Sequence, residues 1–213
     1  MFPSSRCPFA GEGRNVILLV LFTKQGYRPI GARTLVRIMR ATITKNDREV
    51  CNIDHPERID LREDPGAIAR IDCARQYPNL GALLLNLNAD ESPFATFGCK
   101  VWTSTEGSGA ESTEFASRID LILSPATAPG ESQYDDLARR LAELLEREPG
   151  DALRAQLHIA PAQLAGGRRG FCLRFFLFAR GAGEKQTQLR WNLGLARVQQ
   201  AILFLARAIR QNR

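Results

Sequence analysis

The sequence lacks the long apolar runs and the repeats that would identify a membrane protein or a repeat array. Its one candidate run, "VILLVLF" at residues 16–22, is far shorter than the roughly 20 residues that a bilayer-spanning helix requires. The stretch "TKQGYRP" follows it without the small-residue cleavage site of a signal peptide, so we interpret the run as a buried strand. No period of roughly 20 to 50 residues recurs. We therefore expect a globular protein that does not associate with membranes.

The sequence also lacks any Cys-x-x-Cys motif. Its five cysteines are Cys7, Cys51, Cys73, Cys99 and Cys172, which lie far apart along the chain. An odd number of widely spaced cysteines argues against a zinc ribbon or a disulfide framework and is typical of a reducing compartment. We therefore expect a cytoplasmic protein that holds neither a metal nor another cofactor.

Acidic residues are scarce in the last quarter of the chain. Residues 163–213 contain ten basic residues and a single acidic one, Glu184, whereas residues 1–162 contain 19 basic and 22 acidic residues. A positive charge concentrated in one region indicates binding to nucleic acid or another polyanion. The other interpretation is codon composition, because 25 of the 29 basic residues are arginine and could simply form solvated faces.

Hydrophobic residues make up 44% of the 213 positions, which is enough for a substantial core, and we expect a single domain over residues 1–213. Alternating apolar residues predict a strand over residues 34–44, which forms a hairpin with residues 50–53. Asp64 followed by Pro65 predicts a helix that begins there and continues to about Arg75. Alternation predicts another strand over residues 82–88.

The rest of the chain is predicted to contain two further helices and five further strands. Apolar spacing at Tyr134, Leu137 and Leu141 predicts an amphipathic helix that starts near Ser132, and a further helix is predicted from about Ala196 to Arg210. Strands are predicted at residues 94–103, 115–123, 155–160, 170–180 and 188–195. The pattern indicates an α+β fold with a mainly antiparallel sheet of about eight short strands and three helices, the last of them C-terminal.

A glycine-rich segment, "GAGEK" at residues 181–185, raises the question of a phosphate-binding loop. Such a loop requires Gly-x4-Gly-Lys-Ser/Thr followed by a helix. Here Glu184 separates Gly183 from Lys185, and Leu189, Trp191, Leu193 and Leu195 alternate with polar residues as in a strand. We therefore interpret residues 170–195 as a β-hairpin.

The hairpin places arginines and aromatic residues on one face of the sheet. Alternation puts Arg174, Phe176, Phe178 and Arg180 together, beside Gln188, Arg190 and Asn192 of the second strand. Aromatic rings stack on bases while arginines neutralise phosphates. The candidate nucleic-acid-binding residues are Arg168, Arg169, Arg174, Phe176, Phe178, Arg180, Lys185 and Arg190. The alternative is that helices cover both faces, with Phe176 and Phe178 in the core.

Residues for catalysis are few. The two histidines, His55 and His158, lie far apart, and we interpret His158 as a structural histidine within a strand. His55 lies in an acidic loop, which is either a weak metal site or simply a solvated loop. A metal-dependent nuclease requires carboxylates at adjacent strand ends with a nearby lysine. The best approximation is the set Asp90, Glu91, Lys100 and Asp120, a combination that chance also produces.

The motifs identify no known family. We expect a non-enzymatic subunit of a larger assembly that binds single-stranded nucleic acid, or another polyanion, through its basic C-terminal segment, residues 163–213. Two alternatives remain: a protein-interaction or structural subunit whose arginines meet acidic surfaces of other protein subunits, and the metal-dependent nuclease.

Overall fold

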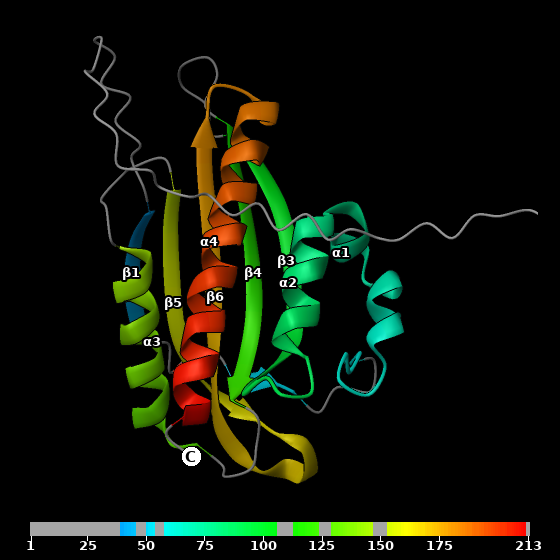
Figure 1. Cartoon of the computed structure of the whole chain (residues 1–213), viewed down its shortest axis with the longest axis vertical. Helices are drawn as coiled ribbons and strands as arrows, with labels where there is room; N and C mark the ends of the chain where they lie inside the picture. The colour runs from blue at the N-terminus through cyan, green and yellow to red at the C-terminus, as the bar shows by residue number, and fades with distance from the viewer. Residues whose placement is uncertain are drawn as a thin grey trace, which may run out of the picture. The chain divides into compact units, whose positions relative to one another are not determined.

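The computed structural model describes residues 39–45, 50–53, 58–105, 113–123, 129–146 and 153–211. These residues form a compact α+β unit within Val36–Arg213. In Figure 1, helices α2, α3 and α4 all lie on the same face of a twisted sheet. The α+β class with a mainly antiparallel sheet is therefore confirmed, and so is the C-terminal position of the last helix.

The described chain contains a sheet of six strands, rather than the eight expected. They are β1 (Met39–Lys45), β2 (Cys51–Asn52), β3 (Phe94–Thr105), β4 (Thr113–Leu123), β5 (Leu153–Gln163) and β6 (Arg169–Gly181). The order across the sheet is β1-β5-β6-β4-β3, and all pairs are antiparallel except those that β1 and β2 make with β5. The predicted hairpin of β1 with β2 was wrong, because both strands run parallel to β5 along the same edge.

The helices are α1 (Asp72–Gln76), α2 (Pro78–Leu87), α3 (Glu131–Leu145) and α4 (Glu184–Gln211), with 3-10 helices η1 (Pro65–Arg70) and η2 (Ala165–Gly167). The predicted helix start at Asp64 is confirmed, since its Oδ1 accepts a hydrogen bond of 3.2 Å from the amide of Ala67. The helix does not continue to Arg75 unbroken, because Ile71 is extended and separates η1 from α1.

The strand predicted over residues 82–88 was wrong, because residues 82–87 belong to α2 and Asn88 is its C-cap. Leu80, Leu83, Leu84 and Leu87 are all buried, at the spacing of one helical face. Pro78 occupies the first turn, where its missing N–H costs no helical hydrogen bond. The three consecutive leucines 83–85 fit alternation and helical spacing equally well, and the start signal at Pro78 distinguishes the two.

The predicted second strand of the hairpin was also wrong, because residues 188–195 lie in α4, a helix of 28 residues. Trp191, Leu195, Val198, Ile202 and Leu205 are buried against the sheet at intervals of three and four residues. The helix approaches the sheet closely at Gly194, where a Cβ would lie 3.1 Å from both Cδ atoms of Leu177. None of the described helices combines the length and apolar character needed to cross a membrane.

Two apolar clusters hold the unit together. The larger one fills the space between the sheet and the helices, and the smaller one covers one end of the opposite face with residues that include Cys51, Ile53, Ile122 and Leu164.

The fold also brings cysteines together that the sequence separates widely. Cys51 and Cys172 approach to 2.7 Å between Sγ atoms, and Cys73 and Cys99 to 2.6 Å. All four are free thiols.

The thiols of the second pair are not equivalent. Cys99 is the hydrogen-bond partner of Cys73, and this bond lowers the pKa of the Cys73 thiol from its ordinary value. The same pairing, together with burial, raises the pKa of Cys99. Cys73 is therefore the thiol of this pair that carries a thiolate more readily.

Several sequence interpretations fall outside the described residues. These are the strand at residues 16–22, the turn at residues 46–49, and the loop that contains His55. They remain predictions.

Candidate functional site

The face of the sheet opposite the helices carries the candidate site. On β6, Leu173, Phe175 and Leu177 pack in the core with the helices, so the alternate residues point to the opposite face. The alternation predicted for this strand is therefore correct. Among the described elements, the helices all pack on the first face, and β2 with the segment after β5 covers only one end of the second.

Register places four rows of side chains across this face. The first row contains Arg180 and Glu114; the second, Arg154, Phe178, Ala116 and Trp102; the third, Gln156, Phe176, Arg118 and Lys100; the fourth, His158, Arg174, Asp120 and Gly98. We call these residues the open sheet face. The same parity on β3, β4, β5 and β6 assembles residues from four distant segments into one surface.

An aromatic cluster occupies the centre of the open sheet face. The rings of Phe176 and Phe178 are nearly parallel, with centroids 6.2 Å apart, and Trp102 meets both edge-on at 6.5 and 6.2 Å. The His158 ring lies 4.7 Å from that of Phe176. All four side chains are half-buried. Parts of their apolar rings therefore reach the surface, unlike the fully buried Phe115 and Phe175 on the helix side.

Arginines surround these rings. The Arg154 guanidinium lies over the Phe178 ring, 4.4 Å from its centroid, which is a cation–π contact. Glu114 receives an ion pair of 2.7 Å from Arg180 and lies 3.7 Å from Arg154. The side chains of Arg180 and Arg154 remain 53% and 41% exposed, so both cations can also reach a ligand.

A buried ion-pair network lies beside the cluster. Asp120 is 3% exposed, and its carboxylate is 3.2 Å from Nη2 of Arg118 and 3.6 Å from Nε of Arg174. Gly98 on the neighbouring strand makes room for it, since a Cβ there would lie 2.8 Å from the Asp120 Oδ2. Five cations and two carboxylates give the open sheet face a formal charge of +3: Lys100, Arg118, Arg154, Arg174 and Arg180 against Glu114 and Asp120.

The structure brings together only half of the predicted site residues. Arg174, Phe176, Phe178 and Arg180 share the open sheet face. Arg168 instead lies in the turn between β5 and β6, and Arg169 is the first residue of β6, opposite Gln163. Lys185 is exposed in the first turn of α4, and Arg190 lies on α4. Nη1 of Arg190 donates a 2.5 Å hydrogen bond to the backbone carbonyl of Arg180. Gln188 and Asn192 are likewise on α4 and not on the sheet.

Sequence analysis missed the contributions of the other strands. Trp102 and Lys100 from β3, Arg118 from β4 and Arg154 from β5 complete the face. The sequence shows which residues share a face within each strand, but it does not show which strands pair with one another. His158, interpreted as structural, lies on the same face, next to Phe176.

The residues considered for a nuclease are not gathered around a metal position. Asp120 faces Arg118 and Arg174, and Glu91 forms an ion pair of 2.6 Å with Arg210 at the end of α4. Lys100 is opposite Arg118 in the sheet register. Within the described ranges, no group of three or more His, Cys, Asp or Glu side chains could hold a metal ion.

Fold and site together define an α+β protein whose sheet has a helix-covered face and a basic aromatic face. Comparison with protein-family models, with curated proteins and with solved structures gives no match. The functional argument therefore depends on the chemistry of the surface itself.

Proposed function

We propose that this protein binds single-stranded nucleic acid through the open sheet face, without catalysis. The observation that carries the proposal is the cluster of Trp102, Phe176 and Phe178, half-buried on the sheet and bordered by arginines. Bases of any sequence can stack on such rings, because every base has a π-face. The arginines supply the charges that the phosphate backbone requires.

The arrangement also accounts for the spacing of the charges. The side chain of Arg154, on β5, is 41% exposed at one side of the rings, and Lys100 is exposed at the other, on β3. A strand of nucleic acid that crosses β5, β6, β4 and β3 would therefore meet cation, aromatic rings and cation in turn. Such a surface favours single strands, whose bases are unstacked and accessible, over duplexes.

Removal of one ring or one cation should weaken this binding in different ways. Phe178→Ala is expected to cost about 1–3 kcal/mol, roughly 5- to 150-fold in affinity, through lost stacking. Arg154→Gln should reduce the slope of log affinity against log salt by about 1, because one phosphate contact is lost. Fluorescence anisotropy with labelled single-stranded RNA and DNA over a salt series measures both effects.

Arg140→Gln is the matched control, since Arg140 is an exposed arginine of α3 on the helix side. It should leave the salt slope unchanged. Equal slopes for the Arg154 and Arg140 variants, or no binding by the wild-type protein at low salt, would contradict the proposal. Substrate length is checked with and without a chelator, and chelator-sensitive cleavage would favour the nuclease alternative instead.

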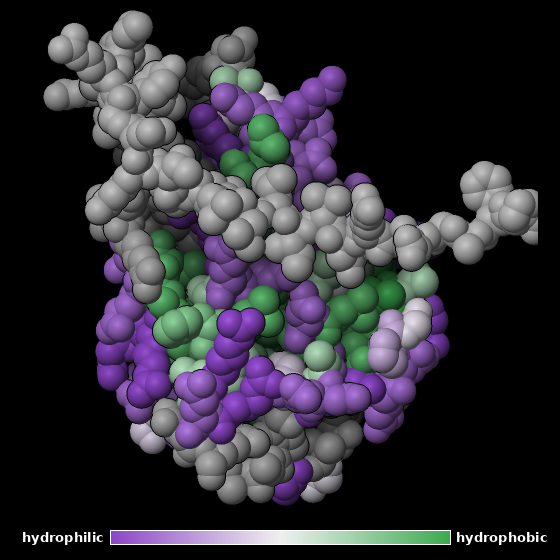
Figure 2. Space-filling view, viewed as in Figure 1, coloured by the Kyte–Doolittle hydropathy of each residue, from purple (hydrophilic) through white to green (hydrophobic). Residues whose placement is uncertain are grey.

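A second candidate function is that of a protein-interaction subunit, and it is favoured by the outer surface of α4. Leu189, Leu193 and Phe204 are 61%, 56% and 59% exposed along this helix. Leu193 and Phe204 also line a groove of about 580 Å³ beside α3, with Arg197 among the lining residues. Figure 2 shows that apolar surface on this face lies in patches between polar side chains. An apolar partner surface with acidic edges would fit this groove.

Leu193→Glu tests this candidate without disturbing the fold. Because Leu193 is exposed, its replacement should change the free energy of unfolding by no more than about 0.5 kcal/mol. Partners recovered from an extract with the wild-type protein and with the Arg154→Gln variant should be lost with Leu193→Glu. Retention of all partners by Leu193→Glu would exclude the groove as their binding surface.

A further inference from the structure

A second cavity lies at the end of the sheet, away from the aromatic cluster. It has a volume of about 260 Å³ and lies where the C-terminal end of β4 meets the N-terminal ends of β3 and β6. Its apolar wall comes mainly from Ile53, Ile122, Leu164 and Phe171. An apolar cavity with a few polar groups is the usual form of a small-molecule site.

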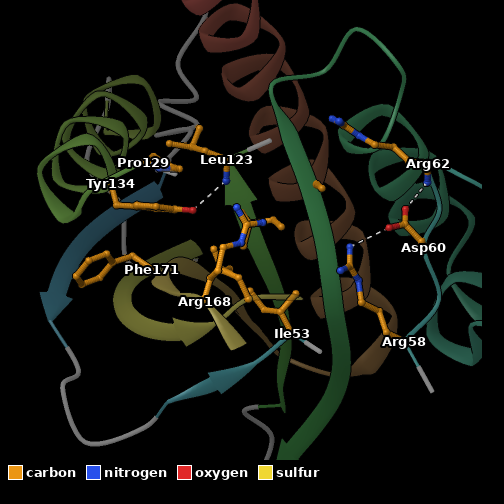
Figure 3. Close-up of a pocket in the computed structure, with 12 residues that line it drawn as sticks. Ile53, Arg58, Asp60, Arg62, Leu123, Pro129, Tyr134, Arg168 and Phe171 are labelled. Atoms are coloured by element: carbon orange, nitrogen blue, oxygen red, sulfur yellow. Dashed lines mark hydrogen bonds and ion pairs between the residues drawn. The ribbon is translucent and has the colours of Figure 1, made fainter. Parts of the chain in front are cut away.

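Among the described residues that line this cavity, three are arginines and one is a carboxylate, Asp60. Arg58 forms an ion pair of 3.0 Å with Asp60, and Arg62 donates a hydrogen bond of 2.7 Å to the carbonyl of Phe94. Arg168 comes from the turn between β5 and β6, and in Figure 3 its guanidinium points into the cavity. A guanidinium fork matches carboxylate and phosphate oxygens, so these side chains indicate an anionic ligand.

A buried hydroxyl is directed into the same space. Tyr134 is 2% exposed, and in Figure 3 its ring points into the cavity from α3. Its oxygen accepts a 3.0 Å hydrogen bond from the Leu123 amide, which leaves the phenolic proton for a further acceptor. Burial raises the pKa of Tyr134 to about 12, so the phenol keeps this proton at neutral pH. The Nε of Arg58 is also buried, without a hydrogen-bond partner in the described chain.

We infer that this cavity binds a small amphipathic anion, with the head group on Arg168 and the Tyr134 hydroxyl and the apolar body against Ile122, Leu164 and Phe171. The volume limits the apolar body to a short chain or a single ring. Neither the charge nor the hydroxyl alone would specify such a ligand. The charge, the hydroxyl and the apolar wall together favour an amphipathic anion over an inorganic one, because an inorganic anion would leave the apolar wall exposed to water.

The inference is tested with four probes that share an eight-carbon chain: octanoate, octyl phosphate, octanol and octylammonium. Isothermal titration calorimetry with the full chain should give a dissociation constant below about 1 mM for at least one of the two anions. The neutral and cationic probes should bind at least about 10-fold more weakly, because a charge-assisted hydrogen bond is lost. The preferred anion identifies a carboxylate or a phosphate head group.

Arg168→Ala should weaken binding of the preferred anion by about 10-fold, and Tyr134→Phe by about 2- to 10-fold. Arg169→Ala is the matched control, since Arg169 is the neighbouring arginine, is exposed, and does not line the cavity. Circular dichroism confirms that each variant is folded. Equal effects of the Arg168 and Arg169 variants, equal affinity for octanol, or no anion binding at millimolar concentration would overturn the inference.

Discussion

Replacement of Trp191 by alanine is expected to lower the free energy of unfolding by about 3–5 kcal/mol, the range for deletion of a large buried aromatic side chain. Trp191 is completely buried, and its ring centroid lies 4.8 Å from that of Phe115 and 5.3 Å from that of Tyr77. Its Nε1 donates a 3.0 Å hydrogen bond to Oγ of Ser117. Truncation therefore opens a cavity between α4 and the sheet and also leaves the Ser117 hydroxyl without this donor.

Chemical denaturation of the wild-type protein and two variants measures the effect. Leu189→Ala is the control, because Leu189 is 61% exposed on the same helix and its truncation should cost no more than about 0.5 kcal/mol. In a strand, residues 189 and 191 would share one face, and both variants would be strongly destabilised. Similar losses for the two variants would therefore contradict the helical assignment of this segment.

The comparison of α4 with its sequence shows where prediction from pattern failed. Leu189, Trp191, Leu193 and Leu195 alternate because two apolar stripes follow the helix, one buried and one exposed. Over a few residues, a helix with two such stripes and a half-buried strand therefore give the same alternation. The buried stripe continues at Val198, Ile202 and Leu205, so the periodicity over the full helix distinguishes the two structures. A window of eight residues was too short to do so.

The open sheet face shows which part of a site can be derived from a sequence. The order of residues within β6 determined that Arg174, Phe176 and Phe178 share a face, because side chains alternate along every strand. Alternation within a strand does not determine the order of the strands in the sheet. The neighbours of β6 are β4 and β5, and the pairing of β4 with β6 joins segments that lie far apart in the sequence. Trp102 reaches the cluster from β3, two strands away, and the position of a strand in the sheet leaves no local signal in its sequence.

Removal of the Asp120 carboxylate should be among the most destabilising changes on the open sheet face. Asp120→Ala is expected to lower the free energy of unfolding by about 3–5 kcal/mol, because a buried cation then loses a carboxylate with which it forms an ion pair. Arg174 is the main cause, since it is 7% exposed and cannot move its guanidinium into water without disturbing the sheet. Arg118 is about one-third exposed and is expected to turn to solvent at little cost.

A second substitution separates the loss of charge from the loss of packing. Asp120→Ala combined with Arg174→Met should recover most of the lost free energy, because apolar replacement of a whole buried ion pair is often neutral. Arg118→Met in the same background should recover little, so the two double-mutant cycles identify the cation that requires Asp120. If neither replacement restores stability, the carboxylate acts through packing against Gly98 rather than through charge. Recovery by Arg174→Met would show that Asp120 holds the arginine of β6 in place beside the aromatic rings, where the proposed ligand would bind.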